Sequence, residues 1–299
     1  MVRFLFSQQL ITNNYEWIGE YRLDFYEKEP VSLYLNNLTL LERIESDKQS
    51  IDLFSHPWLG RILVINGEIQ HIEKYQSLYH EMLVHLPIAF IPEIRNVLII
   101  GGGSLFAAQE VLKYSSVKSL TLCDYDPFVL DVMKKHYQHA NEVFMDTRFY
   151  YVNSDVIDFL SNSNSIYDLI INDCINISNQ SNIANTSLYH IMAQMCSSTG
   201  LCVDIIYRHI FDKQTTIDSL CYLSDEKSVA FSMVSVPEYP GILHLETIWG
   251  NSKYLSQSAQ RVVNRIQLNN NRGMFNYYNP DYLSYYLYLP PYIKNKFKL

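Results

Sequence analysis

Short apolar runs and longer amphipathic segments alternate through the middle of the chain. Apolar runs that predict strands occur at residues 97–100, 120–123, 149–152, 168–171 and 201–206. Segments with helical character follow the first three, at residues 107–113, 127–137 and 156–160. A continuous apolar run such as 97–100 is typical of a strand buried on both faces. Strands and helices that alternate with short connections favour right-handed crossovers, so we expect an α/β fold with a doubly wound parallel sheet.

The first ninety residues have a different pattern, with short strand-like runs of their own. Residues 61–65 and 68–72 flank Asn66-Gly67, which predicts a β-hairpin with a two-residue turn. Apolar residues then recur at helical spacing through 79–86, and we expect that helix to end near Pro87. No internal repeat or long linker interrupts the chain.

Composition and charge narrow the class of protein. The 299 residues are 48% hydrophobic and carry a formal net charge of −8, which is typical of a soluble globular protein and unfavourable for binding nucleic acid. The five cysteines form no CxxC pair, which favours reduced thiols over disulfides or a zinc site. The apolar run Phe4–Phe6 is too short for a signal peptide, and no run is long enough to span a membrane. We therefore expect a cytoplasmic protein that acts away from membranes.

Glycine and aspartate residues come directly after the predicted strands. Gly101, Gly102 and Gly103 are three of only ten glycines, and Asp124, Asp155 and Asp173 follow or end later strands. Ligands of doubly wound sheets bind outside these strand ends, and an acidic residue about twenty positions after a glycine turn suits ribose hydroxyls. The alternative is that the glycines only allow tight packing between strand and helix.

The glycine turn departs from the dinucleotide-binding pattern. Ser104, Leu105 and Phe106 follow it, where a pyrophosphate requires small residues and accessible backbone amides. The bulky side chains of Leu105 and Phe106 therefore favour, as the ligand, a nucleoside without pyrophosphate, such as an S-adenosyl compound, over NAD.

Longer stretches, taken in order, resemble one enzyme family. They are Trp58–Gln70, Tyr79–Met82 with His85 and Pro87, Val97–Gly103, Glu110–Lys113, Asp124–Asp126, Pro237–Pro240 and Tyr277–Asn279 with Leu289 and Pro290. This series resembles the spermidine synthase (polyamine aminopropyltransferase) family over most of the chain. The resemblance implies a small N-terminal β domain before a Rossmann-like, doubly wound, mostly parallel sheet. It also implies a homodimer or homotetramer that transfers the aminopropyl group of decarboxylated S-adenosylmethionine to an amine.

The resemblance also implies domain bounds. We expect an N-terminal β domain with a linking helix over residues 1–90. A Rossmann-like, S-adenosyl-binding catalytic domain would occupy residues 91–252. A C-terminal helical segment, residues 253–299, would pack on the catalytic domain.

Position by position, the resemblance implies roles for ten residues. Those that would bind the S-adenosyl co-substrate are Gln49, Gly101, Gly102, Gly103, Ser104, Asp124 and Asp155, with Asp124 at the ribose and Asp155 at the adenine amino group. The catalytic carboxylate would be Asp173, and Tyr79 and Tyr239 would line the transfer site. An alkylamine with a pKa of about 10 is mostly charged at neutral pH, so a carboxylate is needed to take its proton. Position alone favours a capping or turn role for Asp173 and packing roles for the two tyrosines, so the catalytic roles rest on the resemblance.

Several positions depart from the family pattern. Ser104 replaces an aspartate that pairs with the ammonium of the donor, and Leu105 and Phe106 replace glycines. Neutral residues at the acceptor site replace acidic or amide residues of the family; they are Tyr75, Gln76, Asn176 and Ile205. Because a buried ammonium is costly without a carboxylate, we expect an acceptor other than a standard polyamine, such as a small molecule, a modified peptide or a nucleotide natural product.

The sequence therefore predicts a transferase that uses S-adenosylmethionine or its decarboxylated form. The group transferred would be aminopropyl or 3-amino-3-carboxypropyl, since Ser104 removes a charge that would repel a donor carboxylate. Two alternatives stay open: an S-adenosylmethionine-dependent methyltransferase, and a catalytically inactive partner subunit. No metal is expected, because His80 and His85 have no third ligand at metal spacing.

Overall fold

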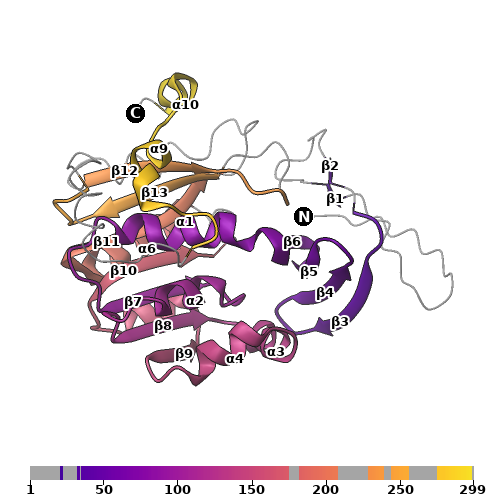
Figure 1. Cartoon of the computed structure of the whole chain (residues 1–299). Coiled ribbons are helices and arrows are strands. Elements are labelled where there is room, and N and C mark those ends of the chain that lie inside the picture. Colours follow the sequence, from indigo (N-terminus) through magenta and orange to yellow (C-terminus); the bar gives the residue numbers. More distant parts are fainter. Residues whose placement is uncertain are drawn as a thin grey trace. The chain divides into compact units, whose positions relative to one another are not determined.

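The computed structural model describes residues 21–22, 32–33, 35–174, 182–207, 228–238, 244–255 and 275–297. The chain divides into two compact units. The first comprises residues 1–76 and 236–241, and the second comprises residues 77–235 and 242–299. Figure 1 labels the helices and strands of both units along the chain.

The first unit is built around a four-stranded antiparallel sheet. Its strands, in spatial and chain order, are β3 (Thr39–Glu45), β4 (Ser50–His56), β5 (Gly60–Ile65) and β6 (Glu68–Ile72), followed by the short helix η1 (Glu73–Tyr75). Two short strands, β1 (Tyr21–Arg22) and β2 (Ser32–Leu33), pair separately. Asn66 and Gly67 connect β5 to β6 with φ values of 49° and 76°, as a tight hairpin turn requires. The predicted hairpin is confirmed.

The second unit contains a seven-stranded mixed sheet. Five parallel strands form most of it: β7 (Asn96–Gly101), β8 (Ser119–Asp124), β9 (Phe149–Asn153), β10 (Tyr167–Asp173) and β11 (Cys196–Tyr207). The antiparallel strands β13 (His244–Gly250) and β12 (Ser228–Val234) extend it beyond β11, which gives the order β12-β13-β11-β10-β7-β8-β9. The predicted α/β fold with a small preceding β unit is confirmed.

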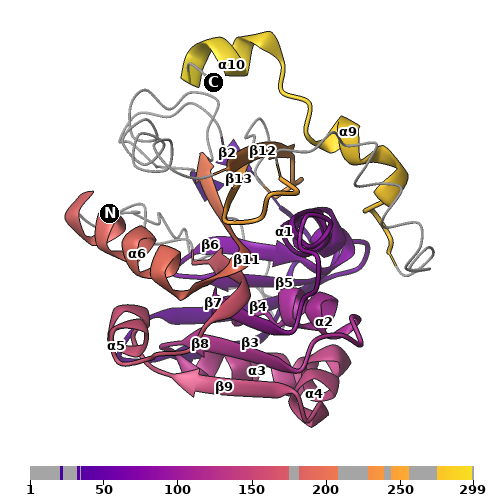
Figure 2. The same cartoon turned by 90° about the vertical axis from the view of Figure 1, so that its left-hand side faces the viewer.

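Helices lie on both faces of this sheet (Figure 2). On one face are α5 (Val156–Ser161) and α6 (Asn182–Met195), and on the other are α1 (Gln76–Ile88) and α2 (Phe106–Leu112). The remaining helices are α3 (Pro127–His136), α4 (Gln138–Met145), η3 (Pro280–Tyr282), α9 (Leu283–Tyr286) and α10 (Pro291–Phe297). None of the helices in these described ranges has both the length and the apolar character needed to cross a membrane.

Helix α1 ends close to its proline. We expected the helix to end near Pro87, and it ends at Ile88 with Pro87 in its last turn. The amides of Phe90 and Ile91 then bond to the carbonyls of Pro87 and Ile88, which tightens the end of the helix. The missing amide of a proline is therefore accommodated where the helix is already ending.

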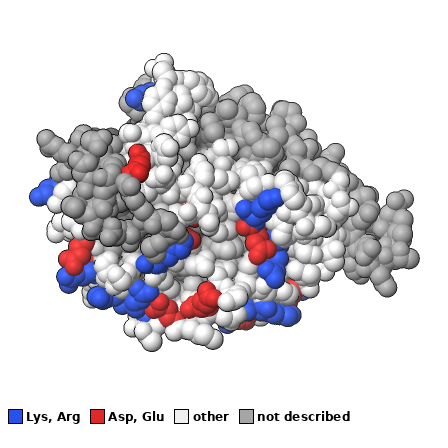
Figure 3. Space-filling model, in the orientation of Figure 1, with Lys and Arg blue, Asp and Glu red and all other residues white. Residues whose placement is uncertain are grey.

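Apolar side chains from the sheet and α6 form a large part of the core. Strand residues Leu98, Ile170 and Trp249 pack with Leu188 and Met192 of α6, and all five are almost completely buried. Nearer the C-terminus, Leu289 and Ile293 pack against Leu245 of β13. Basic and acidic side chains stand close together on the surface drawn in Figure 3. Among the described residues, Arg95 and Glu93 form an exposed ion pair. Exposed pairs of this kind add little stability, so burial of the core holds the sheet together.

Candidate functional site

The strand order reverses at β7, and the glycine turn lies at that point. The chain proceeds from β7 to β8 and β9 on one side, and then returns to β10 and β11 on the other. Ligands of doubly wound sheets bind outside the strand ends at such a switch point. Gly101, the last residue of β7, pairs in register with Asp173, the last residue of β10. Two of the predicted site positions are therefore adjacent.

Each of the three glycines occupies a position that a side chain would disturb. Gly101 and Gly102 have φ values of 73° and 71°, a left-handed conformation that favours glycine. A Cβ on Gly101 would lie 2.9 Å from the backbone oxygen of Asp173, and one on Gly102 would lie 2.8 Å from Cγ2 of Ile99. A Cβ on Gly103 would lie 3.1 Å from Oδ2 of Asp124. The turn thus keeps the backbone close to two of the predicted aspartates.

Asp124 ends β8 beside this turn. Its Oδ1 accepts a hydrogen bond of 2.9 Å from the amide of Asp126, while Oδ2 faces Gly103. Its backbone oxygen accepts hydrogen bonds from Tyr151 and Asn153 of β9, each at 3.2 Å. These contacts fix the carboxylate at the glycine turn, where the sequence predicted a ribose ligand.

Asp155 directly precedes α5 and caps the N-terminus of that helix. Its Oδ1 accepts from the amide of Ile157 at 2.8 Å, and the residue is exposed. Burial, with smaller contributions from the charges of Asp124 and Asp155, raises the pKa of the Cys123 thiol to about 12. The two carboxylates therefore share one edge of the sheet, where their negative potential favours a cationic ligand. The contact of Asp155 with adenine stays a prediction.

The carboxylate of Asp173 is oriented by a tyrosine from α1. The hydroxyl of Tyr79 donates a hydrogen bond of 2.8 Å to Oδ1 of Asp173. The other oxygen, Oδ2, lies 3.3 Å from the point that a Cβ of Gly102 would occupy. The ring of Tyr79 makes edge contacts with the rings of His80 and His244, at centroid distances of 5.0 and 5.9 Å. The structure thus brings Tyr79 and Asp173 together, as the sequence predicted.

The two bulky residues that follow Ser104 after the glycine turn pack in the protein interior. Leu105 and Phe106 are buried, and Phe106 stacks on the ring of His139 with centroids 4.1 Å apart. Leu105 has a φ of 64°, which costs a residue other than glycine about 1 kcal/mol. Ser104 lies between them and the turn, with Oγ 3.5 Å from Nε2 of His80. Burial of Leu105 and Phe106 accounts for their bulk without reference to a ligand.

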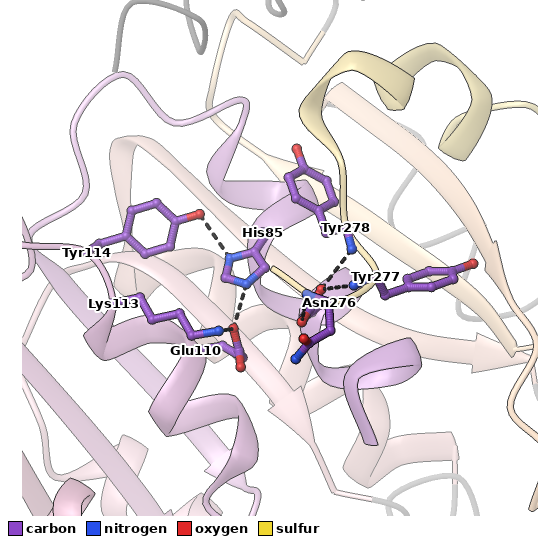
Figure 4. Close-up of polar contacts among 8 residues, drawn as sticks. His85, Glu110, Lys113, Tyr114, Asn276, Tyr277 and Tyr278 are labelled. Carbon is purple, nitrogen blue, oxygen red and sulfur yellow. Dashed lines mark hydrogen bonds and ion pairs between the residues drawn. The ribbon is translucent and has the colours of Figure 1, made fainter. Parts of the chain in front are cut away.

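A buried polar network holds α1 in place (Figure 4). Both carboxylate oxygens of Glu81 accept backbone hydrogen bonds of 2.7 Å, from residues 276, 277 and 278. One turn later, His85 bonds through Nε2 to Glu110 at 2.8 Å and through Nδ1 to the Tyr114 hydroxyl at 2.9 Å. Because Tyr79 precedes Glu81 by two residues, this network also supports the tyrosine that contacts Asp173.

The charge states within this network follow from its hydrogen bonds. Burial lowers the pKa of His85 and outweighs its hydrogen bond with Glu110, so the imidazole is neutral. Burial opposes ionisation of Glu110, but hydrogen bonds from His85 and Lys113 more than compensate and lower its pKa. A neutral His85 donates from Nε2 to Glu110 and accepts at Nδ1 from Tyr114, whose own pKa burial raises strongly.

Several residues important to this site were not identified as functional from the sequence. Glu81, His85 and Glu110 were noted only as parts of the resemblance, although their contacts support α1. His244 and Glu246 are buried in β13, a strand that the sequence pattern did not predict, and the ring of His244 contacts that of Tyr79. The sequence signal that could have identified them is a histidine and a glutamate two positions apart within an apolar run.

Three positions inferred from the sequence are not part of this geometry. Tyr239 and Asn176 lie outside the described residues. Gln49 belongs to the first unit, where its backbone amide donates a 3.0 Å hydrogen bond to Oγ of Ser46. Its predicted contact with the co-substrate stays a prediction. No group of three or more metal-ligating side chains capable of holding an ion occurs within the described ranges.

The fold and this edge of the sheet define a Rossmann-like α/β domain with a carboxylate at its switch point. Residues 76–258 match the spermine/spermidine synthase domain family, and the chain belongs to that family. This membership confirms the family inferred from the sequence and the expectation of an enzyme of spermidine synthase type.

Individual relatives match this chain over different lengths. The polyamine aminopropyltransferase of Buchnera aphidicola subsp. Acyrthosiphon pisum is 29% identical over 279 residues, 90% of this chain and 96% of that protein. The corresponding protein of Lachnospira eligens is 37% identical over 129 residues, 43% of this chain and 45% of that protein. A crystal structure of spermidine synthase from Thermotoga maritima is similar in fold, with a TM-score of 0.76, 23% identity and coverage of 90% and 91% of the two chains. A spermidine synthase in complex with the transition state analogue AdoDATO also has a TM-score of 0.76, at 22% identity and with coverage of 90% and 92%.

Proposed function

We propose that this chain transfers an aminopropyl-type group from an S-adenosyl donor to an amine, with Asp173 as the catalytic carboxylate. The observation that carries the proposal is the orientation of Asp173 by Tyr79 directly beside the glycine turn. Membership of the spermine/spermidine synthase family supports this chemistry. So do the names of the relatives, which are polyamine aminopropyltransferases.

The donor would bind along the carboxyl ends of β7, β8 and β9. Gly101–Gly103 would allow the nucleoside to approach the backbone, and Asp124 would bind its ribose hydroxyls. Asp155 and Gln49 would complete the nucleoside contacts. The carboxylates at this edge give it the negative potential that suits a sulfonium cation.

Asp173 would prepare the acceptor for attack. A sulfonium carbon is already activated, so the protein has mainly to align the attacking nitrogen and keep it unprotonated. One oxygen of Asp173 accepts the Tyr79 hydrogen bond, which fixes the plane of the carboxylate beside Gly102. The carboxylate would then take a proton from the acceptor ammonium, with Tyr239 as a further residue of the transfer site.

The form of the donor depends on Ser104. A hydroxyl at this position carries no negative charge, and it lies close to His80 rather than to a carboxylate. We infer that intact S-adenosylmethionine is tolerated as donor, in which case the 3-amino-3-carboxypropyl group is transferred. The decarboxylated donor would deliver aminopropyl from the same position.

The acceptor is proposed to differ from a standard polyamine. This rests on the neutral residues Tyr75, Gln76, Asn176 and Ile205, which stand where the family has acidic or amide side chains. A small molecule or a modified peptide with a primary amine would satisfy Asp173. We further propose a cytoplasmic homodimer or homotetramer, which analytical ultracentrifugation of the purified chain would test.

Product analysis tests the reaction. The purified chain is incubated with each donor and a panel of amines, and the nucleoside products are separated by chromatography. Methylthioadenosine is the expected product and marks propyl-group transfer. Formation of S-adenosylhomocysteine instead would establish the methyltransferase alternative, and absence of both with every acceptor would favour an inactive partner subunit. Preference for one donor by at least tenfold in kcat/KM would assign the donor.

A further inference from the structure

A series of aromatic rings connects the tyrosine that orients Asp173 to helix α4. The ring of Tyr79 contacts that of His80 at a centroid distance of 5.0 Å, and the ring of His80 contacts that of Phe106 at 5.2 Å. Phe106 in turn stacks on His139, with centroids 4.1 Å apart and an angle of 21° between the ring planes. Because Phe106 is the first residue of α2, the series joins α1 to α4 through the residue that begins the helix after the glycine turn.

The two histidines of this series also lie beside the polar groups of Ser104. The hydroxyl oxygen of Ser104 lies 3.5 Å from Nε2 of His80. The carbonyl oxygen of Ser104 lies 3.0 Å from Nε2 of His139. Because a carbonyl oxygen can only accept a hydrogen bond, Nε2 of His139 is the donor. A side chain of α4 is thus bonded to the backbone of the residue that directly follows the glycine turn.

Burial fixes the ring of His139 and the backbone that it contacts. His139 is 9% exposed, and its ring neighbours Phe106 and Tyr137 are 4% and 3% exposed. Tyr137 makes edge contacts with both of the other rings, at centroid distances of 5.8 and 5.4 Å. Leu105, between Ser104 and Phe106, has a φ of 64°, which a residue with a side chain adopts only where its surroundings impose it. The packed rings and the hydrogen bond from His139 are surroundings of that kind.

Ser104 follows the two glycines that face the carboxylates of the proposed site. A Cβ on Gly102 would lie 3.3 Å from Oδ2 of Asp173, and one on Gly103 would lie 3.1 Å from Oδ2 of Asp124. Under the proposed function, Asp124 binds the ribose and Asp173 prepares the attacking amine. The carbon chain on the sulfonium therefore has to extend from one carboxylate toward the other, along the turn that Ser104 follows.

We propose that His139 is a positioning residue for the donor, because its hydrogen bond to the carbonyl of Ser104 sets where that residue stands beside the chain carried by the sulfonium. The inference rests on the proposed function, which places the donor along the glycine turn. His139 acts through Ser104, and stacking on Phe106 fixes the plane of its ring. His139 therefore contributes to affinity for the chain to be transferred and leaves affinity for the nucleoside unchanged.

Calorimetric titration without an acceptor tests the proposal. The probes are methylthioadenosine, which lacks the chain to be transferred, S-adenosylmethionine and its decarboxylated form. The quantity compared is the donor ratio, the Kd of a donor divided by the Kd of methylthioadenosine. In His139→Phe the ring can still stack on Phe106 but no longer donates to Ser104, so the donor ratio is expected to rise about tenfold for at least one donor. The Kd of methylthioadenosine is expected to stay within about twofold of the wild-type value.

Two further variants separate this role from a structural one. Phe106→Leu keeps the donor atom of His139 but removes the ring on which it stacks, and is expected to raise the donor ratio as well. Phe144→Leu is the control, because Phe144 also belongs to α4 but contacts Phe149 of β9, with centroids 5.1 Å apart. Its donor ratio is expected to equal that of the wild type. An unchanged ratio in His139→Phe, an equal loss of affinity for all three probes, or a similar rise in Phe144→Leu would overturn the proposal.

These titrations require no turnover, so the positioning role and the proposed reaction can fail separately. A raised donor ratio in His139→Phe, without formation of methylthioadenosine by the wild type from either donor, would support the role of His139 and remove the proposed reaction. Formation of methylthioadenosine together with an unchanged donor ratio would support the reaction and remove the role of His139.

Discussion

The hydroxyl of Tyr79 donates a 2.8 Å hydrogen bond to Oδ1 of Asp173, although the two residues are 94 positions apart. Tyr79 comes from the first turns of α1, and Asp173 from the end of β10. The phenol fixes the plane of the carboxylate on the side away from Gly102. This contact connects the strand that carries the proposed chemistry to a helix held by a buried polar network.

Substitutions at this pair should separate proton transfer from orientation. Asp173→Asn keeps the shape of the side chain but removes its basicity, so kcat is expected to fall about 10²- to 10⁴-fold. Tyr79→Phe leaves the carboxylate in place without its donor, and about a tenfold loss is expected. Steady-state assays measure kcat, and calorimetry measures methylthioadenosine affinity, which both variants should retain. Unchanged kcat in Asp173→Asn would remove Asp173 from its proposed role.

The glycine turn should be intolerant of a single methyl group. In Gly101→Ala the new Cβ would lie 2.9 Å from the backbone oxygen of Asp173, in a residue with a φ of 73°. Because both strand ends would have to shift, a loss of about 2–4 kcal/mol in the free energy of unfolding is expected. Denaturant titration measures that loss.

Gly103→Ala is the matched comparison for this prediction. Gly103 has no positive φ, and its Cβ would meet the side chains of Val129 and Asp124 at 3.0 and 3.1 Å. Nucleoside affinity is therefore expected to fall more than stability. A Gly101→Ala variant as stable as the wild type would show that the strand ends yield readily.

The buried parallel strands of the fold could be predicted from the sequence, but β13 and α6 could not. Runs such as Val97–Ile100 are apolar throughout because both faces of the sheet are covered. Strand β13 is equally buried, but its run contains His244, Glu246 and Thr247, which hide the apolar pattern. Helix α6 begins at Asn182 with a weak amphipathic pattern, so its sequence did not predict a helix.

Anchoring of α1 by Glu81 should contribute strongly to stability. Its carboxylate accepts three backbone hydrogen bonds of 2.7 Å and is completely buried. Glu81→Gln keeps one acceptor oxygen and replaces the other with a donor, so a loss of about 3 kcal/mol in the free energy of unfolding is expected. The control is Glu93→Gln, which removes an exposed ion pair with Arg95 and should change little. Similar losses in the two variants, measured by denaturant titration, would contradict this role.

Stability should decrease as the pH falls below about 6.5, in part because of His85. Burial holds the pKa of folded His85 below its ordinary value of 6.5. Between the folded and the unfolded pKa, the unfolded chain binds a proton that the folded chain does not, so lowering the pH favours unfolding. Denaturant titrations between pH 7.5 and 5 should show a smaller loss in His85→Gln than in the wild type. Equal losses would mean that His85 titrates normally in the folded protein.

The candidate site could be predicted only in part, because its members come from distant segments. Gly101, Asp124 and Asp173 follow buried strands, and that position alone brings them to one edge of the sheet. The contact of Tyr79 with Asp173 depends on how α1 crosses the sheet, which local sequence does not specify. The bulk of Leu105 and Phe106 was interpreted as a ligand preference, whereas packing against His139 explains Phe106.

Charge at position 104 should control the choice of donor. Ser104 Oγ lies 3.5 Å from Nε2 of His80, immediately after the glycine turn. A carboxylate introduced by Ser104→Asp would attract the ammonium of the decarboxylated donor and repel the carboxylate of intact S-adenosylmethionine. We expect the ratio of kcat/KM for the decarboxylated over the intact donor to rise by at least tenfold, measured as methylthioadenosine formation with each donor. Ser104→Asn introduces nearly the same volume without charge and should leave the ratio unchanged. A shift of equal size in both variants would show that space at this position, and not charge, selects the donor.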